Sequence, residues 1–138
     1  MNYSIHHIKM IDLPFDLADN GDLVVMEAFK HVPFAIARVF VVRGWELAVR
    51  GQHAHKACSQ FLTCPYGSVD IICKDGDNVV KYNLNHPNVG LLIPPSIWAQ
   101  QNYLTDNAVL TVLCDRPYEP GDYIRNYDEY LEYRRNNS

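Results

Sequence analysis

Short apolar or alternating segments, separated by turn-forming residues, fill the chain from about residue 5 to residue 112. Alternation over about four to eight residues is typical of strands, and a succession of such segments is typical of an all-β sandwich or barrel. The expected strands are Leu23–Ala28, Ala35–Val42, Gln60–Cys64, Ser68–Cys73, Val79–Leu84, Gly90–Ile93 and Ala108–Cys114. No long helical pattern interrupts them, so the sequence predicts a meander or a jelly roll.

The C-terminal segment has a different period. Tyr127, Tyr130, Leu131 and Arg134 follow one another at intervals of three and four residues. Residues at this spacing share one face of a helix. We therefore expect a short C-terminal helix that packs on the barrel.

The composition indicates one folded domain, residues 1–138, because a chain of this length buries one core and leaves little material for a second. Its net charge is −4, and the 12 Lys and Arg residues are scattered. Nucleic acid polymers are therefore unlikely partners, since they require a basic stripe. A few local arginines still suffice to hold the two phosphates of a single nucleotide.

The four cysteines show neither a CxxC pair nor zinc-finger spacing, so we expect free thiols in a reducing compartment. No apolar run approaches the length that crosses a bilayer, and the start of the chain lacks the apolar stretch of a signal peptide. These features predict a cytoplasmic protein without a membrane partner.

His53 and His55 are the residues most suggestive of chemistry, because side chains two apart on a strand point to the same face. Gln60 and Gly67 follow at spacings that resemble the first motif of cupins. In metal-dependent cupins, a Glu stands at the position that Gln60 has here. The second motif has a histidine where this chain has Ala99. Two imidazoles alone leave an ion underligated, so we expect no metal and no other cofactor, with a loosely bound zinc as the alternative.

Two arginines are candidates for substrate binding. Arg38 lies in an apolar segment, where an unpaired guanidinium is costly, so it either binds a diphosphate or developing enediolate or forms a structural ion pair. Arg50 is at an odd offset from His53 and is predicted to point away from it unless Gly51 marks a β-bulge.

Three further side chains are candidates for the pocket. Gln60 orients a histidine, binds a sugar hydroxyl or is a satisfied interior amide. Trp98 and Tyr103 either line the pocket, where they would stack on a nucleotide base, or belong to the core, as barrel aromatics commonly do.

Three segments together carry a more specific resemblance: PFAIARVFVV, RGQHAHK and DRPYEPGDYIRNYDEYL. They resemble the nucleotide-sugar 3,4-ketoisomerases of the cupin superfamily, over about residues 21–131. The resemblance implies an all-β, cupin-type jelly-roll barrel with a short C-terminal helix, and it makes His53 and His55 the paired catalytic histidines.

The same resemblance implies a cofactor-independent isomerase. Its substrate would be dTDP-4-keto-6-deoxyglucose, converted through an enediol to a dTDP-3-keto-6-deoxyhexose for 3-amino-3,6-dideoxyhexose biosynthesis. Such sugars enter lipopolysaccharide O-antigen or another surface glycan. The resemblance also implies a homodimer. In such a dimer, the N-terminal strands are candidates for exchange between the subunits.

Two departures from the family pattern affect expected nucleotide contacts and the proton relay. Asn20-Gly21 stands where relatives have Arg-Gly, and Phe40 stands where they often have Tyr.

The alternative functions are a nucleotide-sugar 3,5-epimerase, a non-catalytic sugar-nucleotide-binding cupin and a metal-dependent oxygenase. Related epimerases pair a histidine with an Asp and a Tyr, and the sequence suggests no such pairing around His53.

Overall fold

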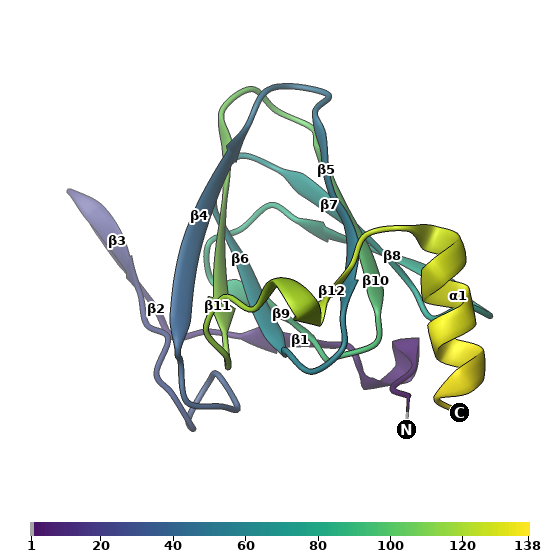
Figure 1. Cartoon of the computed structure of the whole chain (residues 1–138). Coiled ribbons are helices and arrows are strands. Elements are labelled where there is room, and N and C mark those ends of the chain that lie inside the picture. The colour runs from purple at the N-terminus through teal and green to yellow at the C-terminus, as the bar shows by residue number, and fades with distance from the viewer. Residues whose placement is uncertain (1) are drawn as a thin grey trace.

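The computed structural model describes residues 2–138, which form two five-stranded antiparallel sheets that face each other as a barrel (Figure 1). The first sheet contains, in order, β1 (Lys9–Asp12), β9 (Val89–Ile93), β6 (Gln60–Tyr66), β11 (Ala108–Cys114) and β4 (Arg38–Gly44). The second contains β12 (Tyr123–Ile124), β5 (Val49–His55), β10 (Trp98–Tyr103), β7 (Val69–Lys74) and β8 (Val79–Leu84). The expected all-β barrel is confirmed.

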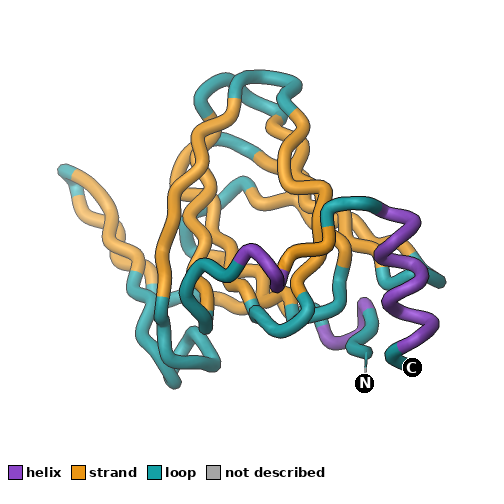
Figure 2. The backbone as a smooth tube through the Cα atoms, viewed as in Figure 1, coloured by secondary structure: helices purple, strands orange, loops and turns teal. Residues whose placement is uncertain are grey.

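The remaining elements lie outside the two sheets (Figure 2). A hairpin projects from the barrel, and short helical segments flank the second sheet (Figure 1). These elements are β2 (Phe15–Ala18), β3 (Gly21–Val24), η1 (Ile5–His7), η2 (Pro120–Asp122) and α1 (Tyr127–Asn136). The helix α1 is the one that the three- and four-residue spacing predicts.

Two predicted strand boundaries are wrong. The strand expected at Leu23–Ala28 is β3, which begins at Gly21 and ends at Val24. The chain then turns, with Phe29 in the left-handed region at φ 63°. The strand expected at Ala35–Val42 begins only at Arg38, because the preceding segment crosses the outer face of the first sheet instead of pairing along it.

The core occupies the space between the sheets, and alternation determines which side chains enter it. In β7, Val69, Ile71 and Cys73 are buried, and the residues between them are partly exposed. Apolar side chains that leave water in this way are the main stabilising contribution to the fold. Two smaller clusters cover the outer faces of the sheets.

The cluster under α1 fixes the wall of the second sheet. Tyr130 is fully buried, and its hydroxyl lies 2.7 Å from the carbonyl oxygen of Ser96. Asn126 begins the helix, since its side-chain oxygen accepts a hydrogen bond from the backbone N–H of Glu129 at 3.0 Å. In residues 2–138, no helix combines the length and the apolar character needed to span a membrane.

Candidate functional site

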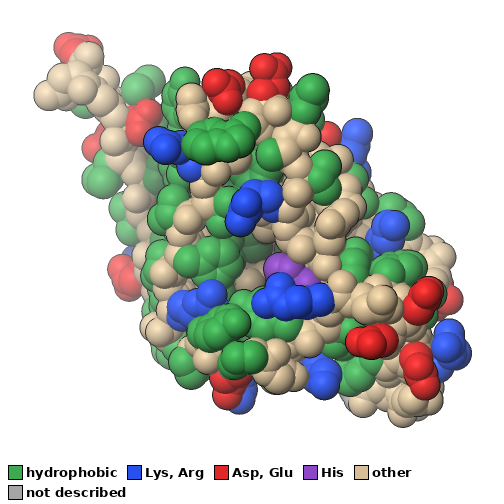
Figure 3. Space-filling view, turned by 45° about the horizontal axis from the view of Figure 1, so that its top comes forward, with side chains coloured by type: hydrophobic (Ala, Val, Ile, Leu, Met, Phe, Trp, Pro, Cys, Tyr) green, Lys and Arg blue, Asp and Glu red, His purple; other side chains and the backbone are tan. Residues whose placement is uncertain are grey.

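A cavity of about 300 Å³ enters the barrel between the two sheets. It is lined by Arg38, Phe40, Val42, Arg50, Gly51, His53, Gln60, Gln101, Tyr118, Tyr123 and Arg125. In the space-filling view, a histidine side chain is visible in a hollow bordered by Lys or Arg side chains (Figure 3). The cavity therefore combines basic groups with a titratable imidazole.

A β-bulge in β5 decides which side chains face the cavity. In the pairing with β10, Ala99 is opposite His53 and Gln100 is opposite Gly51, so Gln52 is an extra residue. Gly51 and Gln52 both have left-handed backbones, with φ 81° and 57°, as expected at a bulge that begins with glycine. The bulge reverses the alternation, and Arg50 lines the cavity together with His53.

The two histidines lie side by side, as their spacing predicts. Their ring centroids are 5.0 Å apart and their planes are nearly perpendicular, at 86°. His53 belongs to the cavity wall, whereas His55 is only 6% exposed. The Nδ1 atom of His53 and the Nε2 atom of His55 are buried and have no hydrogen-bond partner among residues 2–138. Each imidazole thus retains an unused nitrogen.

Asp122 is a partner of His55 that the sequence analysis missed. The Nδ1 atom of His55 lies 2.8 Å from the Oδ2 atom of Asp122, and each side chain is 8% exposed. The sequence analysis considered such a pairing only around His53, and the carboxylate in the structure pairs with His55 instead. The pair escaped detection because 67 residues separate its members.

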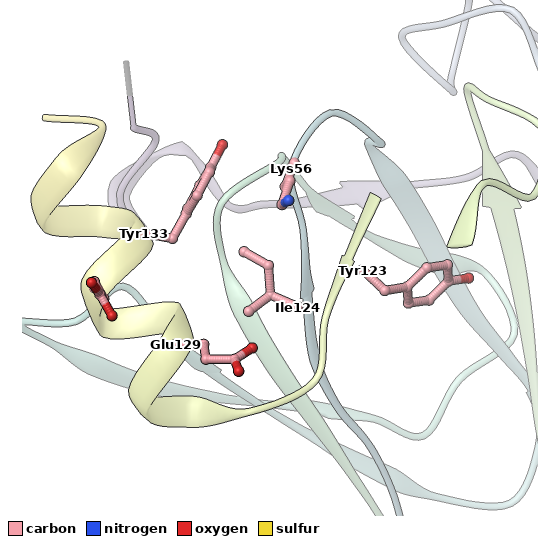
Figure 4. A pocket seen from close by; sticks show the side chains of 6 residues that line it. Lys56, Tyr123, Ile124, Glu129 and Tyr133 are labelled. Atoms are coloured by element: carbon pink, nitrogen blue, oxygen red, sulfur yellow. The ribbon is translucent and has the colours of Figure 1, made fainter. Parts of the chain in front are cut away.

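Tyr123 connects the histidines to Arg38. Its ring lies 5.1 Å from that of His53 and 4.4 Å from that of His55. Its hydroxyl accepts a hydrogen bond from Arg38 Nη1 at 3.3 Å. The close view shows the Tyr123 ring pointing away from α1, whereas the neighbouring Ile124 packs under the helix (Figure 4). Alternation along β12 therefore directs Tyr123 into the barrel.

The cavity is electropositive. Arg38, Arg50 and Arg125 line it, and within residues 2–138 none of the three forms an ion pair with a carboxylate. The alternative of a structural ion pair for Arg38 therefore has no support in this part of the chain. Guanidinium groups without carboxylate partners in a concave site are suited to a diphosphate, which accepts their forked hydrogen bonds.

Burial keeps both imidazoles neutral near pH 7. Burial, together with the adjacent His55, lowers the pKa of His53 to about 4. Burial also lowers the pKa of His55, although the bond to Asp122 opposes the shift. A neutral imidazole has a free lone pair, so both residues are in the state that a general base requires.

This burial predicts a pH-dependent stability. Between pH 6.5 and about 4, an unfolded chain protonates His53 while the folded protein does not. The free energy of unfolding should therefore decrease as the pH falls through this window, by at most about 3 kcal/mol for this group, with no further change below it. We expect the Tm of His53→Asn to decrease less than that of the wild type between pH 7 and pH 4. Equal decreases in the Tm of the variant and of the wild type would contradict the burial of a neutral imidazole at His53.

The other predicted residues divide between the cavity and the core. Gln60 lines the cavity, and its Nε2 atom donates to the sulfur of Cys114 at 3.8 Å. Tyr103 is fully buried, and its hydroxyl donates to Oε1 of the cavity-lining Gln101 at 2.8 Å. Tyr103 thus reaches the cavity only through Gln101.

Trp98 lies on the other face of β10. Its ring packs against Tyr127 of α1 with centroids 5.1 Å apart, and it belongs to the cluster that the helix covers. The expectation that Trp98 lines the pocket is therefore wrong, because alternation directs it away from the barrel interior.

Seven residues that line the cavity were not among the predicted site residues: Phe40, Val42, Gly51, Gln101, Tyr118, Tyr123 and Arg125. A signal was present for two of them, because Tyr123 and Arg125 are two apart within the segment DYIR and so share a face of an extended segment. The two-residue strand β12 was too short to be recognised from an apolar pattern.

One group of side chains has donor atoms that a metal would accept. Donors of His55, Cys58 and Asp122 lie within 4.8 Å of one another. The neighbouring Cys114 thiol and burial raise the pKa of Cys58, which opposes the thiolate form that binds metals. We predict that prolonged dialysis against a chelator leaves turnover unchanged. A loss that zinc or iron restores would contradict this.

A second hollow, of about 190 Å³, lies outside the barrel between α1 and β12 (Figure 4). Lys56, Glu129, Glu132 and Tyr133 contribute to its lining. It does not include the histidines, so the barrel cavity is the stronger candidate for a catalytic site.

Comparison with known proteins finds relatives that match almost the whole length of the chain. The family model described as "FdtA: WxcM-like, C-terminal" matches residues 1–135. The chain is 36% identical to the TDP-4-oxo-6-deoxy-alpha-D-glucose-3,4-oxoisomerase of Aneurinibacillus thermoaerophilus over 128 residues, 91% of each chain.

Two solved structures are similar to the whole chain. The TDP-quinovose 3,4-ketoisomerase WlaRB of Campylobacter jejuni is 39% identical, with a TM-score of 0.86 over 93% of this chain and 99% of that one. The sugar 3,4-ketoisomerase QdtA of Thermoanaerobacterium thermosaccharolyticum, solved with TDP, is 34% identical, with a TM-score of 0.91 over 96% and 98%.

Proposed function

Because the chain belongs to the WxcM-like, C-terminal (FdtA) family, we propose that it is a sugar-nucleotide 3,4-ketoisomerase. It converts dTDP-4-keto-6-deoxyglucose to a dTDP-3-keto-6-deoxyhexose through an enediol. The observation that carries the proposal is the imidazole of His53 in the wall of a cavity lined by three arginines, none of which pairs with a carboxylate of residues 2–138.

The reaction requires three proton movements that this cavity can support. The proton on carbon 3 is acidic because it is next to the carbon 4 ketone, and His53 removes it as a neutral base. The negative charge then lies on the enediolate oxygen, where the Arg38 guanidinium and the Tyr123 hydroxyl bonded to it stabilise it. A proton moves between the two oxygens, and carbon 4 is reprotonated, which completes the exchange of the keto and hydroxyl positions.

Substrate binding follows from the same lining. Arg38, Arg50 and Arg125 bind the diphosphate, and Gln60 and Gln101 contribute amide groups for sugar hydroxyls. A structure of a histidine-to-asparagine mutant of the related QdtA carries TDP-4-keto-6-deoxyglucose, which supports this substrate class. No group other than side chains of this chain is required for the proton transfers.

The test is the identity of the product. The protein is incubated with dTDP-4-keto-6-deoxyglucose, and the sugar is followed by NMR. We expect a 3-keto species with the 4-hydroxyl restored. Inversion at carbon 3 or carbon 5 with the ketone still at carbon 4 would instead identify an epimerase. Binding of dTDP without a change in the sugar would identify a binding module.

The product is a substrate for an aminotransferase that makes a 3-amino-3,6-dideoxyhexose for lipopolysaccharide O-antigen or another surface glycan. We place the reaction in the cytoplasm. The four cysteines are all buried free thiols, which is in keeping with a reducing compartment.

We further propose that the chain acts as a homodimer. The edge strand β4 exposes Val39 and Val41, and the projecting hairpin exposes Leu17 (72%) and Leu23 (59%) (Figure 1). Apolar side chains gathered on an edge strand and an isolated hairpin are suited to an interface with a second copy. The hairpin is the segment suited to exchange between subunits.

Light scattering after gel filtration checks the oligomeric state. We expect the mass of a dimer for the wild type and dissociation toward the monomer for Val41→Glu. The matched control is Val79→Glu, since Val79 is similarly exposed on the opposite sheet. A monomeric wild type would contradict the proposal.

A further inference from the structure

We propose that Asp122 is a positioning residue for catalysis, which holds His55 in the tautomer with a proton on Nδ1 and a free lone pair on Nε2. This inference rests on the proposed function and deepens it, because it assigns a role to the buried member of the histidine pair. The geometry that carries it is the 2.8 Å separation between His55 Nδ1 and Asp122 Oδ2, with both side chains 8% exposed.

The carboxylate is itself held in place. Its other oxygen, Oδ1, accepts a hydrogen bond from the backbone N–H of Ala57. The carbonyl oxygen of Asp122 accepts from the N–H of Lys56 at 2.9 Å, and its own N–H donates to Glu119 O at 3.0 Å, within η2. These bonds attach the end of β5 to η2, so the position of the carboxylate relative to His55 is fixed.

A fixed carboxylate determines the tautomer. An ionised carboxylate only accepts hydrogen bonds, so the imidazole nitrogen facing it must carry the proton. The unused nitrogen of His55 is then the basic Nε2, which is buried without a hydrogen-bond partner in the described chain. The centroids of the His53 and His55 rings are 5.0 Å apart, so the imidazole that carries this lone pair is adjacent to the cavity base.

The negative charge has a second effect. Burial alone disfavours a protonated His55, and Asp122 opposes this by stabilising the imidazolium. His55 can therefore take up the proton of the protonated His53 while the substrate is an enediolate and then return it to His53. A structural role would require only the bonds between η2 and residues 56–57, and these do not depend on charge or tautomer.

Asp122→Asn separates the two roles. The Asn side chain keeps an oxygen for Ala57 N–H but presents an N–H group to His55, which forces the proton to Nε2. We expect kcat to fall about 100-fold or more, while KM and the affinity for dTDP change less than about threefold. Asp122→Glu restores part of kcat, because it keeps the carboxylate.

The matched control is Asp115→Asn. Asp115 also binds a loop N–H through its carboxylate, that of Ser59 at 2.9 Å, but its side chain has no bond to a histidine in the described structure. We expect its kcat to remain within about threefold of the wild type. Equal losses of kcat in the two variants would overturn the proposal.

The tautomer is measured directly by ¹⁵N NMR of the histidine side chains, with His55→Gln used for assignment. We expect Nδ1–H for His55 in the wild type and Nε2–H in Asp122→Asn. A wild type with Nε2–H would overturn the inference, even if Asp122→Asn failed to fold. If the wild type showed no turnover, the proposed function would fail, whereas the tautomer measurement would still test the role of Asp122.

Discussion

His53→Asn should reduce kcat by about 1000-fold or more while the protein still folds and binds dTDP. Asparagine is similar in size to the imidazole and forms hydrogen bonds, but it takes up no proton near pH 7. The arginines of the cavity are unchanged in the variant, so the affinity for the diphosphate should remain. The loss therefore reports on proton transfer alone.

The measurement is the initial rate of 3-keto product formation, with dTDP affinity determined by calorimetry. His86→Asn is the control, because His86 is exposed and lies outside the cavity. If His53→Asn kept more than about a tenth of the wild-type kcat, His53 would not be the base that removes the carbon 3 proton.

Arg38→Gln should weaken dTDP binding about 10- to 100-fold and lower kcat/KM by at least as much. Hydrogen bonds to charged groups contribute about 1.5–3 kcal/mol, and Gln replaces a charged fork with a neutral amide. The loss in kcat/KM should exceed the loss in affinity, since Arg38 also bonds to Tyr123, whose ring lies 5.1 Å from that of His53.

Arg43→Gln is the matched control for this prediction. Arg43 lies on the same strand, β4, at an odd offset from Arg38, and it is exposed with its guanidinium over the Trp45 ring. The two substitutions remove the same charge from the protein, so general electrostatics cancels in the comparison. Equal affinities of the two variants for dTDP would contradict a diphosphate site at Arg38.

The sequence could predict those parts of the fold that depend on local periodicity. Two-residue alternation identified β4, β6, β7, β8, β9 and β11 and the convergence of His53 and His55, and the three- and four-residue spacing identified α1. The barrel strands β1, β5, β10 and β12 were not among the expected strands. Arg38, Phe40 and Val42 alternate along β4 and all line the cavity, whereas Ile36, which has the same parity, precedes the strand and packs in the outer cluster.

Features that depend on contacts between distant parts of the chain could not be predicted from local periodicity. Asp122 meets His55 only because η2 returns to the end of β5, a contact across 67 residues. The direction of Arg50 depended on a bulge that alternation alone does not predict, although Gly51 marked the place. Trp98 was assigned to the pocket because the sequence does not indicate which face of β10 the helix α1 covers.

Solvent exchange shows whether a neutral histidine within the barrel moves a proton of a 4-keto sugar nucleotide. The wild-type protein is incubated with dTDP-4-keto-6-deoxyglucose in deuterium oxide and followed by proton NMR. We predict a 3-keto product whose carbon 4 carries deuterium from solvent, and no such product with His53→Asn. A wild-type reaction that leaves the carbon 3 proton in place and forms no 3-keto sugar would contradict proton transfer by the histidine.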